Sequence, residues 1–145
     1  MDSGPVDGSV VLMSIHPEYV QAILEGRKRV EFRKAAFQRT VRCAVIYATK
    51  PIMKIVGFFE VTEVERASPE NVWERYGELG STDEQFFFDY YGSRDCAVAI
   101  SIGEVTELDR PLSLPEVYEG MRPPQSFRYL PDGCWDRISE FQLAR

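Results

Sequence analysis

The sequence predicts an α+β domain: a small, mostly antiparallel β-barrel with short helices inserted between the strands. Short runs rich in Val, Ile and Phe recur between turn residues, as in strands of a small barrel. Helical patterns interrupt these runs without any internal repeat. The chain has 145 residues, 44% of them hydrophobic, which is enough apolar surface for one core. We therefore expect a single domain over residues 9–145, preceded by a flexible N-terminal tail at residues 1–8.

Six segments have the composition of strands: residues 9–15, 29–34, 41–47, 55–64, 96–105 and 126–130. The second segment alternates, with Val30 and Phe32 on one face and charged side chains on the other. This alternation predicts a half-buried strand whose charged face, with Glu31 and Arg33, is exposed.

Turn and capping residues place the helices between these strands. Pro17 suits the first position of a helix, and Gly26 suits its end. Residues 69–76 have a helical pattern, and residues 81–84 (Ser-Thr-Asp-Glu) form a possible capping box for a further helix. Residues 114–119 and 135–141 predict two more short helices.

Composition excludes several classes of protein. The 28% charged and 12% aromatic residues argue against global disorder. No apolar run is long enough to span a bilayer, and the acidic start is unlike a signal peptide, so we expect a cytoplasmic protein without a membrane partner. Three scattered cysteines and one histidine predict no disulfide framework, no metal site and no cofactor; Cys43 and Cys96 are expected to be buried.

Charge is distributed unevenly along the chain. The net charge is −6, which argues against coating duplex DNA. Yet residues 27–42 carry seven basic side chains and one acid, Glu31. A local basic strip on an acidic body fits a site for one anion or a short single strand. An ordinary solvated surface explains the charge pattern equally well.

Two separated segments combine basic or hydrogen-bonding side chains with aromatic ones. The first is Gly26-Arg27-Lys28-Arg29-Val30-Glu31-Phe32-Arg33-Lys34, and the second is Arg122-Pro123-Pro124-Gln125-Ser126-Phe127-Arg128-Tyr129-Leu130. This mixture suits an anionic ligand with a flat face. If the fold brings the segments together, we expect them to form one cleft.

These motifs resemble the ASCH domain family, from about Val10 to Leu130. The family marker Gly-x-Lys-x-x-Glu-x-Arg matches residues 26–33, and Pro-Pro-Gln-Ser-Phe-Arg-Tyr at residues 123–129 indicates one subgroup. The resemblance implies a PUA-like β-barrel with a cleft for RNA or a nucleotide-like ligand, lined by Lys28, Glu31 and Arg33. Larger relatives add a helix-turn-helix, for which no residues remain here, so we do not expect duplex DNA reading.

The marker residues have two interpretations. Lys28 and Arg33 could hold a phosphate or a base carbonyl, and Glu31 could accept from a base edge or act as a general base. Replacing Arg33 is then expected to abolish binding with little change in stability. Alternatively, these residues form an exposed cross-strand ion pair that contributes less than about 1 kcal/mol to stability.

Further candidate ligand-binding residues lie at strand ends and in the second segment. Tyr47 could stack on a base, while Thr49 and Lys50 could contact phosphate. Gln125 and Ser126 could read base edges, and Arg128 could pair with phosphate. Alternatively, Tyr47 is an aromatic residue at the edge of the core, Thr49 forms a turn, and Arg128 pairs with an acidic residue. His16 is expected to be a helix cap, and the aromatic residues of segment 86–91 are expected to pack in the core.

Three functions remain open, and we rank them in order. The first is a binding module for single-stranded RNA or a nucleotide-like ligand. The second is an enzyme on RNA or modified nucleosides, a ribonuclease or an acetylcytidine amidohydrolase, with Lys28 and Glu31 as catalytic residues. The amidohydrolases of the family carry Thr where this chain has Glu31. The third is a protein-interaction domain using the acidic residues 55–145.

Overall fold

The structure is a computed structural model that describes residues 8–143, so the tail expected at residues 1–8 lies almost entirely outside the described residues. In chain order the elements are β1 (Ser9–Ile15), α1 (Pro17–Leu24), β2 (Val30–Arg33), β3 (Val41–Ala48), β4 (Lys54–Ala67), α2 (Pro69–Tyr76), the 3₁₀ helix η1 (Gly77–Leu79), α3 (Glu84–Tyr91), β5 (Ala97–Leu112), α4 (Leu114–Val117), β6 (Phe127–Tyr129) and α5 (Cys134–Leu143).

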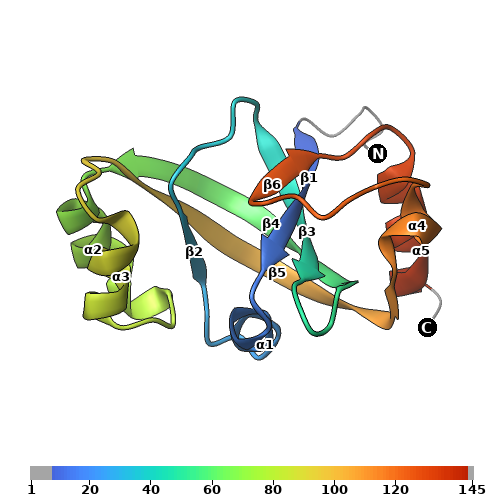
Figure 1. The fold of residues 1–145 in the computed structure, drawn as a ribbon, viewed down its shortest axis with the longest axis horizontal. Coiled ribbons are helices and arrows are strands. Elements are labelled where there is room, and N and C mark those ends of the chain that lie inside the picture. Colours follow the sequence, from blue (N-terminus) through green and yellow to red (C-terminus); the bar gives the residue numbers. More distant parts are fainter. Residues whose placement is uncertain (1–7, 144–145) are drawn as a thin grey trace.

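The strands form one six-stranded sheet in the order β2-β5-β4-β3-β1-β6. β1 pairs with β3 in parallel, and the other neighbouring strands pair antiparallel. The sheet curls into a half-barrel, which leaves β2 and β6 as its two edge strands (Figure 1). The expected α+β class and mostly antiparallel strand pairing are confirmed.

Helices cover the two ends of the curled sheet (Figure 1). At one end, α2 and α3 pack on the apolar face of β2 through Val30 and Phe32. At the other end, α4 and α5 cover a cluster that includes Tyr47 and Ile138. Between them, residues of β1, β3 and β5 form the central core beneath α1. Each helix thus buries its apolar stripe against the sheet.

The connection between β2 and β3 partly closes the gap between the two edge strands. Phe37 packs edge-to-face on Phe127 at 4.8 Å between ring centroids. The backbone N–H of Gln38 donates to Tyr129 Oη at 2.8 Å, and the Arg39 guanidinium lies 4.1 Å from the centre of the Tyr129 ring. These contacts join the β2–β3 connection to β6.

Three details differ from the sequence-based expectations. α3 begins at Glu84 because Asp83 caps it, accepting from the Phe86 N–H at 2.8 Å; the cap is not Ser81. Strands β4 and β5 extend to Ala67 and Leu112, because they pair with each other over most of their length. Cys96 is exposed, since it precedes β5 and does not belong to it. In the described part of the chain, none of the helices has the length and apolarity required to cross a membrane.

Candidate functional site

A cavity of about 420 Å³ lies beside β2, between α3 and the segments that start α1 and β6. Cavities of this size accommodate small ligands. Its lining combines charged groups, hydroxyls and aromatic rings: Ser14, His16, Tyr19, Lys28, Glu31, Phe32, Arg33, Lys34, Ala35, Thr49, Thr82, Phe86, Phe87, Tyr90, Gln125 and Ser126.

The chain leaves α1 through a turn that places Lys28 in the interior. Gly26 has a φ of 82°, the left-handed conformation that glycine adopts readily. The backbone N–H groups of both Arg27 and Lys28 then donate to the Ala22 carbonyl. This turn fixes the start of the approach to β2, and the Lys28 side chain ends only 3% exposed.

Lys28 is a buried cation with three kinds of neighbour. Its Nζ donates to the Gly80 carbonyl at 2.6 Å and lies 3.5 Å from Glu31 Oε1. The ammonium also lies 4.7 Å from the centre of the Tyr19 ring. Burial lowers the pKa of Lys28 because it penalises the charged form, while the Glu31 carboxylate acts in the opposite direction. At a given pH, a larger fraction of Lys28 is therefore in the neutral amine form than for a surface lysine.

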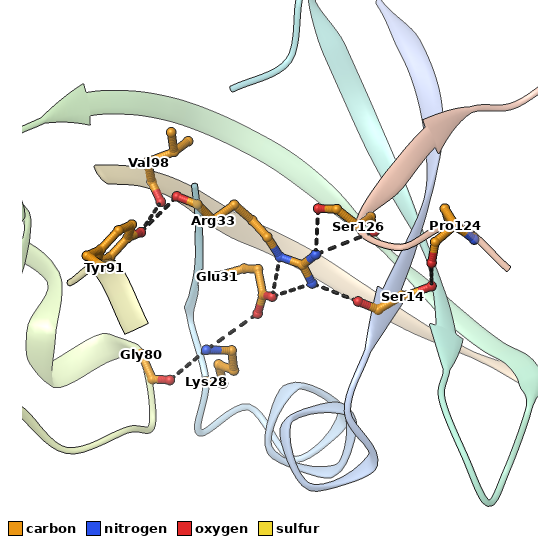
Figure 2. A network of polar contacts seen from close by, with 9 residues as sticks. All are labelled: Ser14, Lys28, Glu31, Arg33, Gly80, Tyr91, Val98, Pro124 and Ser126. Carbon is orange, nitrogen blue, oxygen red and sulfur yellow. Dashed lines mark hydrogen bonds and ion pairs between the residues drawn. The ribbon is translucent and has the colours of Figure 1, made fainter. Parts of the chain in front are cut away.

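Arg33 connects β2 to the opposite edge of the sheet (Figure 2). Its Nε and Nη2 contact Glu31 Oε2 at 2.8 and 2.6 Å. Nη2 also donates to the Ser14 carbonyl at 2.8 Å, and Nη1 donates to Ser126 Oγ at 3.1 Å. The guanidinium thus joins β2 to β1 and to the segment that leads into β6.

The expected exposure of the charged face of β2 is wrong, because all four residues of this strand are buried. The apolar face, with Val30 and Phe32, packs against α2 and α3. The charged face turns towards the inside of the curl, where Lys28, Glu31 and Arg33 are 3%, 6% and 8% exposed. An exposed ion pair is therefore excluded, and the expectation that Arg33 contributes little to stability loses its basis.

Glu31 has cations on both sides. Its Oε2 is occupied by Arg33, while Oε1 is buried and accepts no hydrogen bond, having only the ion pair with Lys28. With Lys28 protonated, two cations surround one carboxylate and the buried group is net positive; with Lys28 neutral, the charges of Arg33 and Glu31 cancel. Within residues 8–143, no three His, Cys, Asp or Glu side chains lie close enough to hold a metal ion.

Aromatic rings of α3 form another part of the cavity wall. Phe86 and Tyr90 lie one helical turn apart on α3 and both line the cavity, as does the buried Phe87, whereas the buried Tyr91 does not. Phe86 is 53% exposed. Lys34 Nζ lies 4.6 Å from the centre of the Tyr90 ring, which places another cation at this wall.

The motif that contains Lys28, Glu31 and Arg33 lies within residues 13–106, which the ASCH domain family model matches. The chain belongs to the ASCH domain family. A protein of Zymomonas mobilis named "ASCH domain-containing ribonuclease" is 30% identical over 128 residues, covering 86% of each chain.

Solved structures agree with this membership. The crystal structure of ASCH from Zymomonas mobilis has a TM-score of 0.85 at 28% identity and covers 92% of this chain and 96% of that one. The N-terminal domain of McrB from Staphylothermus marinus has a TM-score of 0.57 at 9% identity, covering 94% and 99%. The second likeness concerns the fold alone. Together with the curled sheet, the first gives this chain the ASCH/PUA-like fold.

This ASCH domain brings together six of the candidate residues from the sequence. They come from three separate parts of the chain, and each lines the cavity: Lys28, Glu31, Arg33, Thr49, Gln125 and Ser126. The two segments singled out in the sequence do meet, through the contacts of Arg33 with Ser126.

The other three candidates lie away from the cavity wall. Tyr47 is 3% exposed and packs with Leu12 and Ile55 in the core beneath α4 and α5. Lys50 lies in the exposed β3–β4 turn, and the Arg128 side chain is exposed on β6. None of these three lines the cavity of this ASCH domain.

Several lining residues of the ASCH domain were not singled out by the sequence reasoning. His16 occupies the N-cap position of α1, as expected, but its side chain makes no capping hydrogen bond and lines the cavity. Phe86 and Tyr90 were assigned to the core, although their four-residue spacing on one helix face is visible in the sequence. Ser14 and Thr82 carry no sequence signal of their own, because their place depends on how the sheet curls.

Proposed function

We propose that this ASCH domain binds single-stranded RNA with one nucleotide in the cavity, and that it acts on the bound strand as a ribonuclease. The observation that carries the proposal is the buried group of Lys28, Glu31 and Arg33 in the wall of a cavity that also presents aromatic rings. The relative named as a ribonuclease supports the choice of RNA.

Binding would use different parts of the cavity wall for different parts of a nucleotide. Phe86 and Tyr90 offer ring faces on which a base can stack, a contact that contributes roughly 1–3 kcal/mol. Lys34 supplies positive charge for a phosphate, and Gln125 and Ser126 supply hydrogen-bonding groups.

Cleavage would use the 2′-hydroxyl of the bound nucleotide. The 2′-oxygen attacks the phosphorus, so a 2′-O–P bond forms while the bond from phosphorus to the 5′-oxygen breaks. We propose the neutral amine of Lys28 as the base that takes the 2′ proton, since burial lowers its pKa. The leaving 5′-oxygen takes a proton from water, the Lys28 ammonium returns its proton to solvent, and the product is a 2′,3′-cyclic phosphate. Arg33 acts as a positioning residue, because its nitrogens already contact Glu31, Ser14 and Ser126.

A binding module without catalysis is the second candidate. It is favoured by the pairing of Arg33 and Glu31, which leaves neither group free to change partners during a reaction. The acetylcytidine amidohydrolase reaction is a weaker candidate, because Glu31 stands where that reaction is expected to use Thr.

The subgroup, the domain boundaries and the cellular compartment of the protein are also proposed. The Pro-Pro-Gln-Ser-Phe-Arg-Tyr segment would define a subgroup because it brings Gln125 and Ser126 to the cavity. Residues 9–145 would form a single domain that works in the cytoplasm.

The test uses a short fluorescent single-stranded RNA and the same strand with every 2′-oxygen methylated. Binding and product are followed for the unchanged protein, Lys28→Met and the control Lys50→Met, whose side chain lies outside the cavity. A ribonuclease cleaves only the unmethylated strand, and Lys28→Met loses this activity while Lys50→Met keeps it.

Other outcomes separate the alternatives. Binding of both strands without product would favour the module. Release of acetate from acetylated cytidine, measured in parallel, would favour the amidohydrolase. Absence of binding and of product would overturn the proposal.

A further inference from the structure

A second hollow, of about 600 Å³, opens beside the cavity, between the starts of α1 and α3. The two share four lining residues, His16, Tyr19, Thr82 and Phe86. The Tyr19 hydroxyl lies 3.4 Å from Thr82 Oγ1, so their contact forms part of the boundary between the two spaces. A polymer with one unit in the cavity can therefore continue into this hollow.

Phe86 provides a flat apolar surface common to both spaces. It lies in the first turn of α3 and is 53% exposed, whereas its neighbour Phe87 is 1% exposed. Leaving a large aromatic ring in water forgoes the stabilisation that burial would give. Such a ring at the junction of two hollows offers a stacking surface for a base, whatever its identity.

The charge of the hollow is opposite to that of the cavity. Besides His16, its titratable lining groups are the carboxylates of Glu18 and Asp83 and the phenol of Tyr19, whereas Lys28, Arg33 and Lys34 line the cavity. One oxygen of Asp83 accepts from the Phe86 N–H at 2.8 Å as the cap of α3. Its other oxygen and the Glu18 carboxylate can accept hydrogen bonds but cannot donate them. They repel a phosphate and attract an amino group.

We infer that this hollow is the subsite for the base next to the nucleotide in the cavity, and that it selects bases with an exocyclic amino group (adenine, cytosine and guanine) over uracil; the inference rests on the proposed function. Adenine, cytosine and guanine carry an exocyclic amino group that donates to a carboxylate. Uracil has no amino group, and the two carbonyl oxygens that flank its N3–H face Glu18 and Asp83 as acceptor against acceptor. The phosphate between the two nucleotides lies on the basic side of the boundary.

The test uses a pool of RNA with random sequence, and sequencing of the cleaved ends, or of the bound fraction if the protein does not cleave. Glu18→Gln and Asp83→Asn keep the shape of the hollow, and Asn preserves the cap of α3. Glu78→Gln is the control, because this exposed acid lines neither space.

We expect adenine, cytosine and guanine to be favoured over uracil by about five- to tenfold at one position next to the cavity nucleotide. Glu18→Gln with Asp83→Asn removes that preference and leaves the preference at the cavity position unchanged. Phe86→Ala weakens binding of all sequences by about tenfold. Glu78→Gln changes neither the base preference at the two positions nor the binding of RNA.

Two results would overturn the subsite while leaving the proposed function in place. One is a normal preference at the cavity position with no preference beside it. The other is a uniform gain in affinity for all sequences in the Glu18→Gln, Asp83→Asn variant, which would make the hollow a repulsive rim. Absence of any RNA binding would overturn the proposed function and this inference with it.

Discussion

Arg33 donates from Nη1 to Ser126 Oγ at 3.1 Å, a contact that spans the gap between the two edges of the curled sheet. β2 and β6 do not pair through their backbones. The Arg33 side chain therefore helps to close the half-barrel (Figure 2). The same guanidinium holds Glu31 beside Lys28. Arg33 therefore contributes both to closing the half-barrel and to arranging the cavity wall.

Arg33→Ala is expected to lower the free energy of unfolding by about 3 kcal/mol, because it leaves the buried Glu31 carboxylate without its closest cation. Chemical denaturation followed by circular dichroism measures the change. The double variant Arg33→Ala, Glu31→Ala should lose less than the sum of the two single losses. A loss below about 1 kcal/mol in Arg33→Ala would contradict the role of Arg33 in closing the sheet.

Lys28 is expected to titrate with a midpoint below its ordinary value of 10.5, because burial disfavours its charged form. Carbon NMR of the methylene next to Nζ, recorded against pH, reports this midpoint directly. A midpoint at or above 10.5 would mean that the Glu31 carboxylate outweighs burial, and would remove the basis for Lys28 as a base.

The same shift gives stability a specific pH dependence. Between the lowered pKa of Lys28 in the folded protein and 10.5, the unfolded chain holds more protons than the folded one, so stability rises with pH. The cost of burying the charge is fully present below this window and is lost above it. The stability of the unchanged protein relative to Lys28→Met should therefore increase across the window. A difference that stays constant would contradict the shift.

Gly80→Ala should disturb both the fold and the cavity. A Cβ on Gly80 would overlap the Phe32 ring, while the Gly80 carbonyl accepts from Lys28 at 2.6 Å. Forcing this overlap is expected to cost roughly 1–3 kcal/mol of stability and to weaken RNA binding. Thermal unfolding and a binding titration measure the two effects. The loss should shrink in a Phe32→Leu background, and an unchanged loss there would show that the overlap is not its cause.

Lys50→Met and Arg128→Met should leave RNA affinity within about twofold of the unchanged protein, since neither side chain lines the cavity. Ser126→Ala should weaken binding more, because it removes an acceptor of Arg33. Parallel fluorescence anisotropy titrations compare the three variants. A larger loss in Arg128→Met than in Ser126→Ala would move the ligand to the outer face of β6.

Turn and capping residues predicted the order of the elements, because their signals are local. Pro17 and Gly26 mark α1 in the sequence, and both lie where the structure begins and ends that helix. The burial of Glu31 and Arg33 could not be predicted in this way. Alternation shows that one face of β2 is charged, but whether that face meets water depends on the curl of a sheet whose strands are distant in sequence.

The candidate site was predictable in part. Lys28, Glu31 and Arg33 share one motif, whereas Ser126 reaches them through pairing of β6 with β1. Tyr47 lies at a strand end, as many site residues do, but its place in the β3 register points it into the core beneath α4 and α5. Phe86 shows the opposite case, since helical spacing identifies the face it shares with Tyr90 and does not reveal that this face is open.

The most direct test of the central claim is an NMR titration with an RNA strand whose 2′-oxygens are methylated, so that it binds without being cleaved. We expect the backbone amide signals of β2, of residues 82–90 and of residues 125–126 to shift together, because these segments line the cavity. The signals of α5 should stay unchanged. Shifts confined to α4 and α5, with β2 unaffected, would contradict binding in the cavity.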